Sequence, residues 1–308
     1  MSFINYRNGN YVVYFNTKTG DKIRNTHEEN FIPAFAENCD VTITDRCDGA
    51  CPFCYAGCTV NGRHGNLNAA CLDTVPPYTE LAINGNDLSH PDLIPFLKRM
   101  AARHVIVNMT VNQKHFLQHF DFIKTLKDEN LIHGIGVSLV EADATFIKKL
   151  KEIPNTILHV INGVFTKENA IRLMGHNLDI LILGYKTTCR GQSFLDTCNE
   201  EISKNQKWLN ENIVNMMTGF KTIEFDNLAL EQLSMRGKIS NDIWNRHYMG
   251  EEGGFTFFVN LVDNYFAKNS TSPDHYPLME SMMEMFQFLQ SVENNKNTKK
   301  EEMAIIAM

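Results

Sequence analysis

The chain has 308 residues, of which 43% are hydrophobic, and a formal net charge of −7. This length suits one large α/β domain or two smaller ones with a sizeable core. With 29 basic against 36 acidic residues and no long block of Lys or Arg, nucleic acid is not the expected partner. No apolar run approaches the roughly 20 residues of a membrane helix and no signal-peptide core is visible, so we expect no membrane association.

Residues 1–37 are predicted to form a β-meander that packs on the core. The pair Asn8-Gly9 is a two-residue hairpin signal, and residues 11–15 are β-branched or aromatic. A second turn at 19–21 precedes another short strand at 22–24. We expect this segment to have a structural role.

The next feature is a group of closely spaced cysteines. Cys47, Cys51 and Cys54 have the spacing Cys-x3-Cys-x2-Cys directly after an apolar run at 41–44, and Cys58 follows. Thiolates on one loop suit a soft metal or an iron–sulfur cluster, because the loop can wrap around one centre. A structural zinc site, a ferredoxin-type cluster with Cys58 as fourth ligand, and unrelated buried thiols remain alternatives. Such spacing also indicates a reducing, cytoplasmic setting rather than a disulfide framework.

From residue 41 onward, short apolar runs alternate with helical stretches. The predicted strands are 41–44, 80–83, 105–109, 135–139, 156–161 and 180–183, with 222–225 as a further candidate. The predicted helices between them are 92–103, 115–127, 142–151 and 166–174. This alternation predicts parallel strands with crossovers, and hence a barrel or a doubly wound sheet. In a barrel the functional groups lie at the C-terminal ends of the strands, which is where the cysteine loop begins.

Polar residues follow the later strands as well. They are Asn84, Gly85 and Asn86 after the second strand, Thr110 and Asn112 after the third, Ser138 after the fourth, Asn162 after the fifth, and Tyr185, Lys186 and Arg190 after the sixth. Small and polar groups that converge at one end of a barrel are what a charged, zwitterionic ligand requires.

The cysteine motif, with Phe53 just before its third cysteine and Tyr55 just after, resembles the Cys-x3-Cys-x-aromatic-Cys motif of the radical S-adenosylmethionine (SAM) family. The segment 84–86 is similar to the family's Gly-Gly-Glu, 110–112 to Thr-Thr-Asn, and 137–139 to Val-Ser-Leu. This sequence departs from the family at Asn84 and at Asn86, which stands in place of the Glu. An amide can accept a hydrogen bond from an ammonium group, but without charge assistance. The resemblance covers roughly residues 38–226.

The resemblance implies a partial parallel (βα)6 TIM-like barrel over residues 38–226 and a [4Fe-4S] cluster on the three motif cysteines, with Cys58 dispensable. SAM would chelate the open iron, and its reductive cleavage would yield a 5′-deoxyadenosyl radical that abstracts hydrogen from a substrate. A reducing partner such as flavodoxin or ferredoxin is implied. The implied cofactor-binding residues are Phe53, Tyr55, Asn84, Gly85, Asn86, Thr110, Asn112, Ser138 and Asn162.

After a predicted helix at 199–217, the C-terminal part is expected to form an extension over 227–292, a hairpin-plus-helix cap. A hairpin at 255–267 resembles the one that opens the SPASM or twitch extension of peptide-modifying radical SAM enzymes. No cysteine for an auxiliary cluster follows position 198, so we predict one cluster only. An amphipathic helix is expected at 277–292, and residues 293–308 are predicted to be a disordered tail.

The expected substrate is a peptide or protein side chain. A partial barrel leaves a lateral opening, and exposed strand edges can capture an extended peptide. Tyr185, Lys186 and Arg190 are weak candidates for substrate contact, and the two cations could instead grip a phosphate or carboxylate. A radical SAM enzyme acting on a nucleotide or small metabolite therefore remains an alternative, as does a ferredoxin-like electron-transfer protein.

Overall fold

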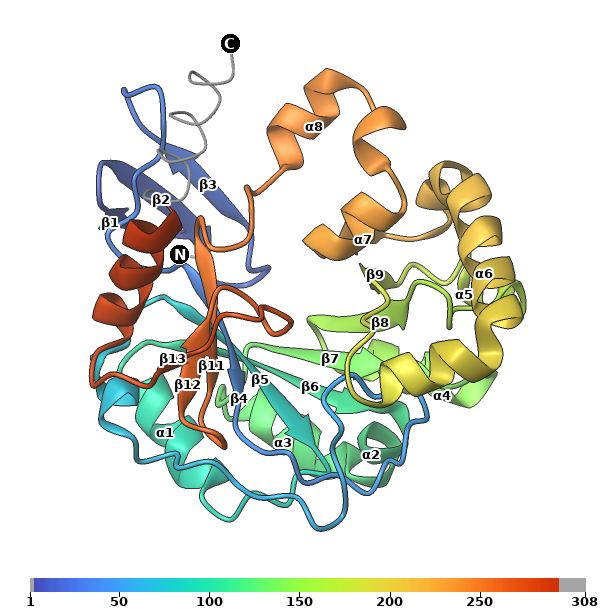
Figure 1. The fold of residues 1–308 in the computed structure, drawn as a ribbon, viewed down its shortest axis with the longest axis horizontal. Coiled ribbons are helices and arrows are strands. Elements are labelled where there is room, and N and C mark those ends of the chain that lie inside the picture. Colours follow the sequence, from blue (N-terminus) through green and yellow to red (C-terminus); the bar gives the residue numbers. More distant parts are fainter. Residues whose placement is uncertain (1–2, 294–308) are drawn as a thin grey trace.

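A computed structural model describes residues 3–293, and a large, mostly parallel sheet lies at its centre (Figure 1). Its strand order is β10-β9-β8-β7-β6-β5-β4-β11-β12-β13. The parallel strands in chain order are β4 (Asn38–Thr42), β5 (Glu80–Asn86), β6 (Ile106–Asn112), β7 (Gly134–Ser138), β8 (Thr156–Ile161), β9 (Asp179–Leu183) and β10 (Thr222–Phe225). The expected mixed α/β architecture around a parallel sheet is confirmed.

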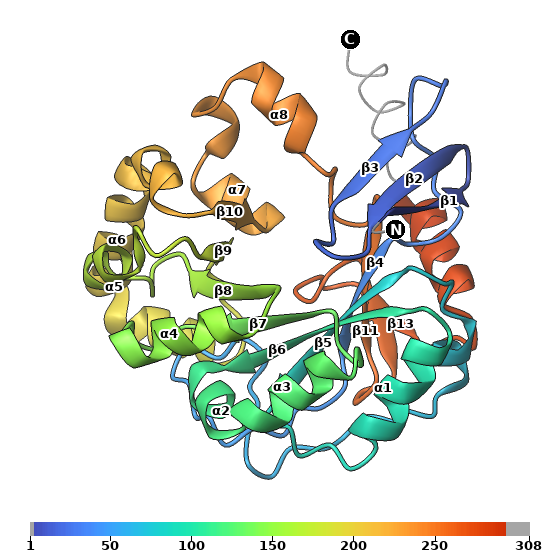
Figure 2. The ribbon, with the colours of Figure 1, turned by 180° about the vertical axis from the view of Figure 1, so that it is seen from behind.

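Helices cover the outer face of this curved sheet (Figures 1 and 2). They are α1 (Leu93–Ala102), α2 (Gln113–Gln118), α3 (Phe120–Asp128), α4 (Ala144–Glu152), α5 (Lys167–Leu173) and α6 (Arg190–Met216), whereas α7 (Asn227–Gln232) lies on the inner side, beside β9 and β10. Helix α1 shows why they dock: Leu93, Phe96, Leu97 and Met100 share one face and are buried. Each such side chain contributes about 1.5–3 kcal/mol through its removal from water.

The expected count of six βα units is not confirmed. The first crossover, from β4 to β5, carries the cysteine loop and only a short 3-10 turn, η1 (Ala70–Thr74), in place of an α-helix. Strand β10 joins the sheet beside β9, so the parallel series is longer than six. Strand β4 also ends before its predicted limit, because the side chain of Asn84 takes the backbone N–H of Ile43 out of the ladder.

Two predicted helices differ in extent. The helix expected at 115–127 is divided into α2 and α3 at His119, whose backbone angles (φ −112°, ψ 27°) are not helical. The helix expected at 199–217 begins at Arg190, nine residues earlier, and is kinked at Cys198 (φ −119°, ψ 26°). No helix among residues 3–293 is long and apolar enough to cross a membrane.

Three antiparallel strands form the N-terminal meander, as predicted. They are β1 (Phe3–Asn8), β2 (Tyr11–Asn16) and β3 (Lys22–Asn25). The ammonium of Lys22 pairs with Glu80 at the start of β5 at 2.9 Å, and Arg24 pairs with Glu37 at 2.8 Å. The turn after β2 accepts a hydrogen bond from Asn155, which precedes β8. The meander therefore lies against the N-terminal ends of the barrel strands.

The predicted hairpin is present as β11 (Thr256–Asn260) and β12 (Tyr265–Ala267). It is part of the main sheet, because β11 pairs in parallel with β4, with Val259 opposite Val41. The short strand β13 (Tyr276–Pro277) pairs with β12, so the last helix begins at 282 and not at 277. Helix α8 (Asn241–His247) lies between α7 and β11. The tail predicted at 293–308 lies outside the described residues except for position 293.

Candidate functional site

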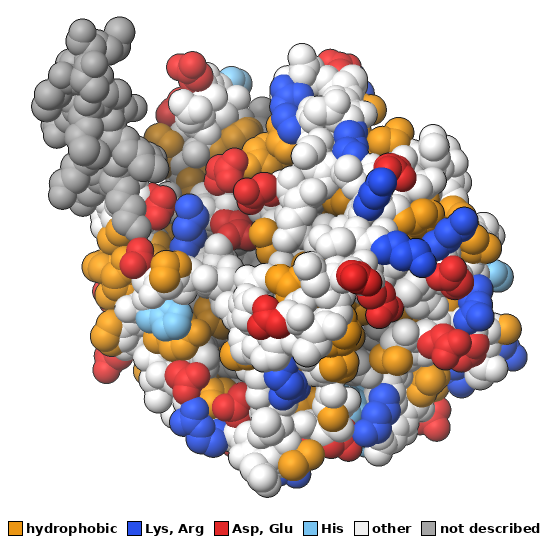
Figure 3. Space-filling view, turned by 45° about the vertical axis from the view of Figure 1, so that its right-hand side comes forward, with side chains coloured by type: hydrophobic (Ala, Val, Ile, Leu, Met, Phe, Trp, Pro, Cys, Tyr) orange, Lys and Arg blue, Asp and Glu red, His pale blue; other side chains and the backbone are white. Residues whose placement is uncertain are grey.

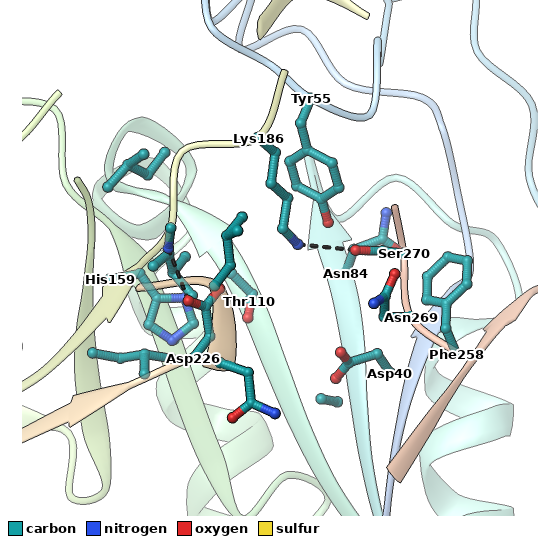
Figure 4. A pocket seen from close by; sticks show the side chains of 18 of the residues that line it. Asp40, Tyr55, Asn84, Thr110, His159, Lys186, Asp226, Phe258, Asn269 and Ser270 are labelled. Carbon is teal, nitrogen blue, oxygen red and sulfur yellow. Dashed lines mark hydrogen bonds between the residues drawn. The ribbon is translucent and has the colours of Figure 1, made fainter. Parts of the chain in front are cut away.

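A cavity of about 1530 Å³ occupies the inside of the sheet, and its lining extends from the meander turn at Gly20 to the C-terminal ends of the strands. Alternate residues of each strand point inward, as the two-residue period of a strand requires. Asp40 of β4, Thr110 of β6 and His159 of β8 line its wall, and Figure 4 shows their side chains around one space. Figure 3 shows acidic side chains gathered around a hollow on one face of the molecule.

The three motif cysteines lie on the loop between β4 and η1 and line this cavity. The thiols of Cys47 and Cys51 lie 3.2 and 3.8 Å from the point where a Cβ on Gly49 would stand. The N–H of Cys47 donates to the carbonyl of Thr59 at 2.8 Å, and this hydrogen bond joins the two ends of the cysteine segment. No three His, Cys, Asp or Glu side chains within residues 3–293 converge closely enough to hold a single metal ion.

The surroundings of the thiols shift their pKa values in different directions. Burial raises the pKa of Cys47 and of Cys51, because a charged thiolate loses hydration. A hydrogen bond from the Cys58 thiol lowers the pKa of Cys54 below its usual value. Cys58 is buried, with 7% of its surface exposed, and it also contacts the side-chain amide of Asn86 at 3.5 Å.

Arg190, at the start of α6, holds the cysteine loop from the far end of the sheet. Its guanidinium donates to the carbonyl oxygens of Cys51 and Cys58, each at 3.0 Å. Thr188 adds a hydrogen bond from its hydroxyl to the carbonyl of Tyr55 at 2.9 Å. Arg190, predicted as a weak substrate contact, does not line the cavity; two of its donors bind the loop backbone instead.

Asn84 and Asn86 hold the loop from the other side while also lining the cavity. Asn84 accepts from the N–H of Ile43 at 2.7 Å and donates to the carbonyl of Thr44 at 2.6 Å. The Asn86 amide donates to the carbonyls of Thr44 and Arg46, both at 3.0 Å. A carboxylate cannot donate these bonds, which gives a physical reason for an amide where the radical SAM motif has an acid.

Gly85 lies between these two asparagines and does not line the cavity. A Cβ at this position would stand 2.8 Å from Cγ of Met109 and 2.9 Å from Cγ1 of Val111. The glycine is therefore required by the packing of β5 against β6, where the ladder register also shifts.

Thr110, Asn112 and Ser138 line the cavity at the ends of β6 and β7, together with Phe53 and Tyr55 of the cysteine loop. The side-chain oxygen of Asn112 caps α2 at the N–H of Lys114, and its amide contacts the Cys51 thiol at 3.5 Å. Within the described part of the chain, the hydroxyls of Thr110 and Ser138 make no hydrogen bond. They are free to bind a ligand in the cavity.

Asn162 and Tyr185 bind neighbouring segments. Asn162 is 1% exposed, does not line the cavity, and donates to Oε1 of Gln232 on α7 at 3.0 Å. Tyr185 lines the cavity, but its hydroxyl donates to the carbonyl of Gly191 at 2.8 Å. The Asn162 side chain thus joins the end of β8 to α7, and the Tyr185 side chain joins the segment after β9 to the start of α6.

Lys186 reaches into the cavity, as its predicted role requires (Figure 4). Its ammonium donates to the hydroxyl of Ser270 at 2.9 Å and lies 4.3 Å from the ring centre of Tyr55. This cation–π contact joins the segment after β9 to the cysteine loop.

Two titratable residues that face the cavity, His159 and Asp40, are not among the site residues predicted from the sequence. His159 has its pKa lowered to about 4 by burial, so its imidazole is neutral at pH 7. Asp40 is surrounded by protein but accessible from the cavity, and burial raises the pKa of its carboxyl while nearby Lys186 acts in the opposite direction. The available signal was the polar residue inside each apolar strand, and the curvature of the sheet directs both side chains into the cavity.

No protein-family model matches this sequence, and a comparison with curated proteins finds no match. Among solved structures, the chain is similar to SuiB of Streptococcus suis bound to S-adenosylmethionine, with a TM-score of 0.54, 10% identity, and 90% of this chain and 84% of that chain covered. It is also similar to SuiB bound to its precursor peptide SuiA, with a TM-score of 0.55, 11% identity, and coverage of 92% and 87%. At this identity the likeness establishes a shared fold.

Proposed function

We propose that this protein is a radical SAM enzyme that modifies a peptide or protein side chain. Three cysteines with the radical SAM spacing face the same cavity as the polar ends of the strands, and this observation carries the proposal. The shared fold supports it, because the similar SuiB structures are bound to S-adenosylmethionine and to a precursor peptide. When bound, a [4Fe-4S] cluster would supply the electron that cleaves SAM to a 5′-deoxyadenosyl radical.

The thiols fit such a cluster better than a single zinc ion. A zinc ion needs its ligands to converge on one point, which no His, Cys, Asp or Glu trio among residues 3–293 does. In a cluster each thiolate binds a different iron, so the thiols stand farther apart. Cys47, Cys51 and Cys54 would be the ligands, while the buried Cys58 supports Cys54 by a hydrogen bond.

The other residues of the site position the loop and present polar groups to SAM. Asn84, Asn86 and Arg190 fix the backbone of the cysteine loop through six hydrogen bonds. Thr110 and Ser138 offer unused hydroxyls that can contact the amino, carboxylate or ribose groups of SAM. The cavity, at about 1530 Å³, exceeds the roughly 300–1,000 Å³ of an ordinary small-molecule site, so it has room for SAM and a substrate side chain.

An extended peptide also has a route to this cavity. Strand β10 pairs with β9 alone among the described strands, so its other edge is free. Glu224 of this edge strand lines the cavity. A peptide that adds to a free strand edge gains backbone hydrogen bonds and places alternate side chains toward the interior.

The test is anaerobic reconstitution with iron and sulfide, followed by reduction in the presence of SAM. We expect 5′-deoxyadenosine by mass spectrometry and a paramagnetic spectrum that changes when SAM is added. A variant with the three motif cysteines replaced by Ala is the control and should show neither. A cluster that is fully formed but ignores SAM would favour an electron-transfer protein and refute the proposal.

The substrate class is tested separately, by incubating the reduced enzyme and SAM with cell extract and comparing the peptide and nucleotide fractions by mass spectrometry. A mass change in a peptide that requires both enzyme and SAM supports the proposal. A modified nucleotide without any altered peptide would overturn the choice of substrate.

A further inference from the structure

We infer that the cavity selects a substrate with a basic side chain, Lys or Arg, and that Asp40 is the carboxylate that pairs with it. This inference rests on the proposed function, because it names the substrate class of the same site. It comes from the charges around the cavity and from the bonds that each charged group already makes.

Acidic side chains outnumber basic ones around the cavity by ten to three. The acidic residues are Asp21, Asp40, Glu80, Glu224, Asp226, Glu231, Glu251, Glu252, Asp274 and Glu293, and the basic residues are Lys186, Arg236 and Lys268. Lys268 pairs with Glu293 at 3.4 Å, and Arg236 lies 5.3 Å from the ring centre of Trp244. This excess of negative charge attracts a cation and repels a phosphate.

Several of these acids already have partners within the fold. Asp226 accepts from the N–H groups of Gly184 and Ala229 and so caps α7. Glu80 pairs with Lys22 at 2.9 Å, and Glu252 accepts from the amide of Asn269. These groups serve the structure, so the excess charge alone does not identify the residue that meets a substrate.

Like those of Glu224 and Glu231, the Asp40 carboxylate makes no hydrogen bond or ion pair within the described part of the chain, but Asp40 is the one of these three on the strand that leads into the cysteine loop. It lies on β4, two residues before the end of the strand that leads into the cysteine loop. Its neighbours in register are Phe258 on β11 and Ala82 on β5, neither of which can donate a side-chain hydrogen bond. Figure 4 shows its carboxylate directed into the cavity, below Asn269 and Ser270.

The Asp40 side chain is exposed toward the cavity, so a substrate can reach its carboxylate, and a substrate cation would meet an acceptor that no donor of the described fold occupies. The charge of Lys186 acts on Asp40, but the Lys186 ammonium donates to Ser270 and no ion pair joins it to Asp40. The ring of Phe258 beside Asp40 offers an apolar surface to the methylene stem of a Lys or Arg side chain. A norleucine side chain would keep the stem contact but leave the carboxylate unpaired.

The test measures binding of three synthetic peptides to the reconstituted protein with SAM and no reductant. The peptides are acetylated and amidated heptamers in which a run of three glycines stands on each side of a central residue, which is Lys, norleucine or Glu. We expect the Lys peptide to bind at least about tenfold more tightly than the norleucine peptide, and the Glu peptide more weakly than both. This comparison uses the parent protein, so it does not depend on whether a variant folds.

In Asp40→Asn, which keeps the shape of the side chain, the preference for Lys over norleucine should fall to about twofold or less. Glu201→Gln, on the exposed part of α6, changes the net charge equally and should keep the full preference. Equal binding of Lys and norleucine by the parent, or a full preference in Asp40→Asn, would overturn the inference. Release of 5′-deoxyadenosine separates the two proposals: SAM cleavage without a Lys preference removes only this inference, and a Lys preference without SAM cleavage removes only the proposed function.

Discussion

Arg190 donates from Nε to the carbonyl oxygen of Cys51 at 3.0 Å, although 139 residues separate them along the chain. The same guanidinium reaches the carbonyl of Cys58, so its fork spans both ends of the segment that holds Cys54. A fork of fixed geometry with charge-assisted donors is well suited to hold a loop in one conformation. Arg190, the first residue of α6, thus holds the backbone of the loop that follows β4.

We predict that Arg190→Lys weakens the cysteine loop more than it weakens the fold. A single ammonium cannot keep both carbonyl contacts in the same geometry, and each lost charge-assisted bond costs about 1.5–3 kcal/mol. Iron retained per chain after reconstitution and desalting should fall by half or more, while the far-ultraviolet spectrum stays unchanged. Arg246→Lys, on the exposed helix α8, is the matched control. Full iron retention in Arg190→Lys would show that the loop does not need the fork.

Cys58→Ala should retain the full iron content of the parent. Cys58 acts as a hydrogen-bond donor to Cys54 and is proposed not to be a ligand. Iron and sulfide analysis of Cys58→Ala and Cys54→Ala, side by side, makes the comparison. Only the Cys54 variant should lose the cluster, and loss of the cluster in Cys58→Ala would instead indicate a four-cysteine, ferredoxin-type site.

Ser138→Ala should weaken SAM binding without affecting iron content. One neutral hydrogen bond is worth about 0.5–1.5 kcal/mol, which corresponds to a rise in Kd of about 2- to 12-fold. Ser138 suits this test better than Asn86, because the amide of Asn86 also holds the cysteine loop and its removal would mix two effects. Equilibrium dialysis with SAM measures the affinity, and an unchanged Kd would remove Ser138 from the binding site.

Gly136→Ala should destabilise the fold by about 1–3 kcal/mol through overpacking. The added Cβ would stand 2.4 Å from Cε1 of His159 and 2.9 Å from Oγ1 of Thr110. Urea unfolding of three variants tests the cause: Gly136→Ala, His159→Ala and the double variant that carries both changes. The double variant should lose less stability than the sum of the two single changes, and strict additivity would show that the imidazole is not the obstacle.

His159 should make stability depend on pH in the acid range. Its folded pKa of about 4 lies below the unfolded value near 6.5, so the unfolded chain binds more protons between these values. Its contribution is fully present above pH 6.5 and is lost as the pH falls, by up to about 2.5 kcal/mol between pH 7 and 4.5. Urea unfolding at the two pH values should show a smaller loss in His159→Gln than in the parent. Equal losses would contradict a neutral, buried imidazole.

Local patterns in the sequence were sufficient for the elements of the parallel sheet. Alternation of apolar runs with helical stretches predicts β5 to β9 within a few residues, because alternate residues of each strand are buried away from the cavity and are apolar. The hairpin of β11 and β12 was also predicted, from turn residues and aromatic strands. The spacing of Cys47, Cys51 and Cys54 pointed to the site because all three belong to one loop.

Tertiary structure decided the contacts between distant segments. Nothing local to residues 256–260 reveals that β11 returns to pair with β4, so the expected cap became part of the main sheet. Arg190 was expected to meet a substrate, but the approach of α6 to the cysteine loop takes up two of its donors. Asp40 and His159 face the cavity only because the sheet curves around it. The sequence by itself determined the strands, the helices and the cysteine motif, since those follow from periodicity and spacing, and the fold decided which polar side chains meet inside the barrel.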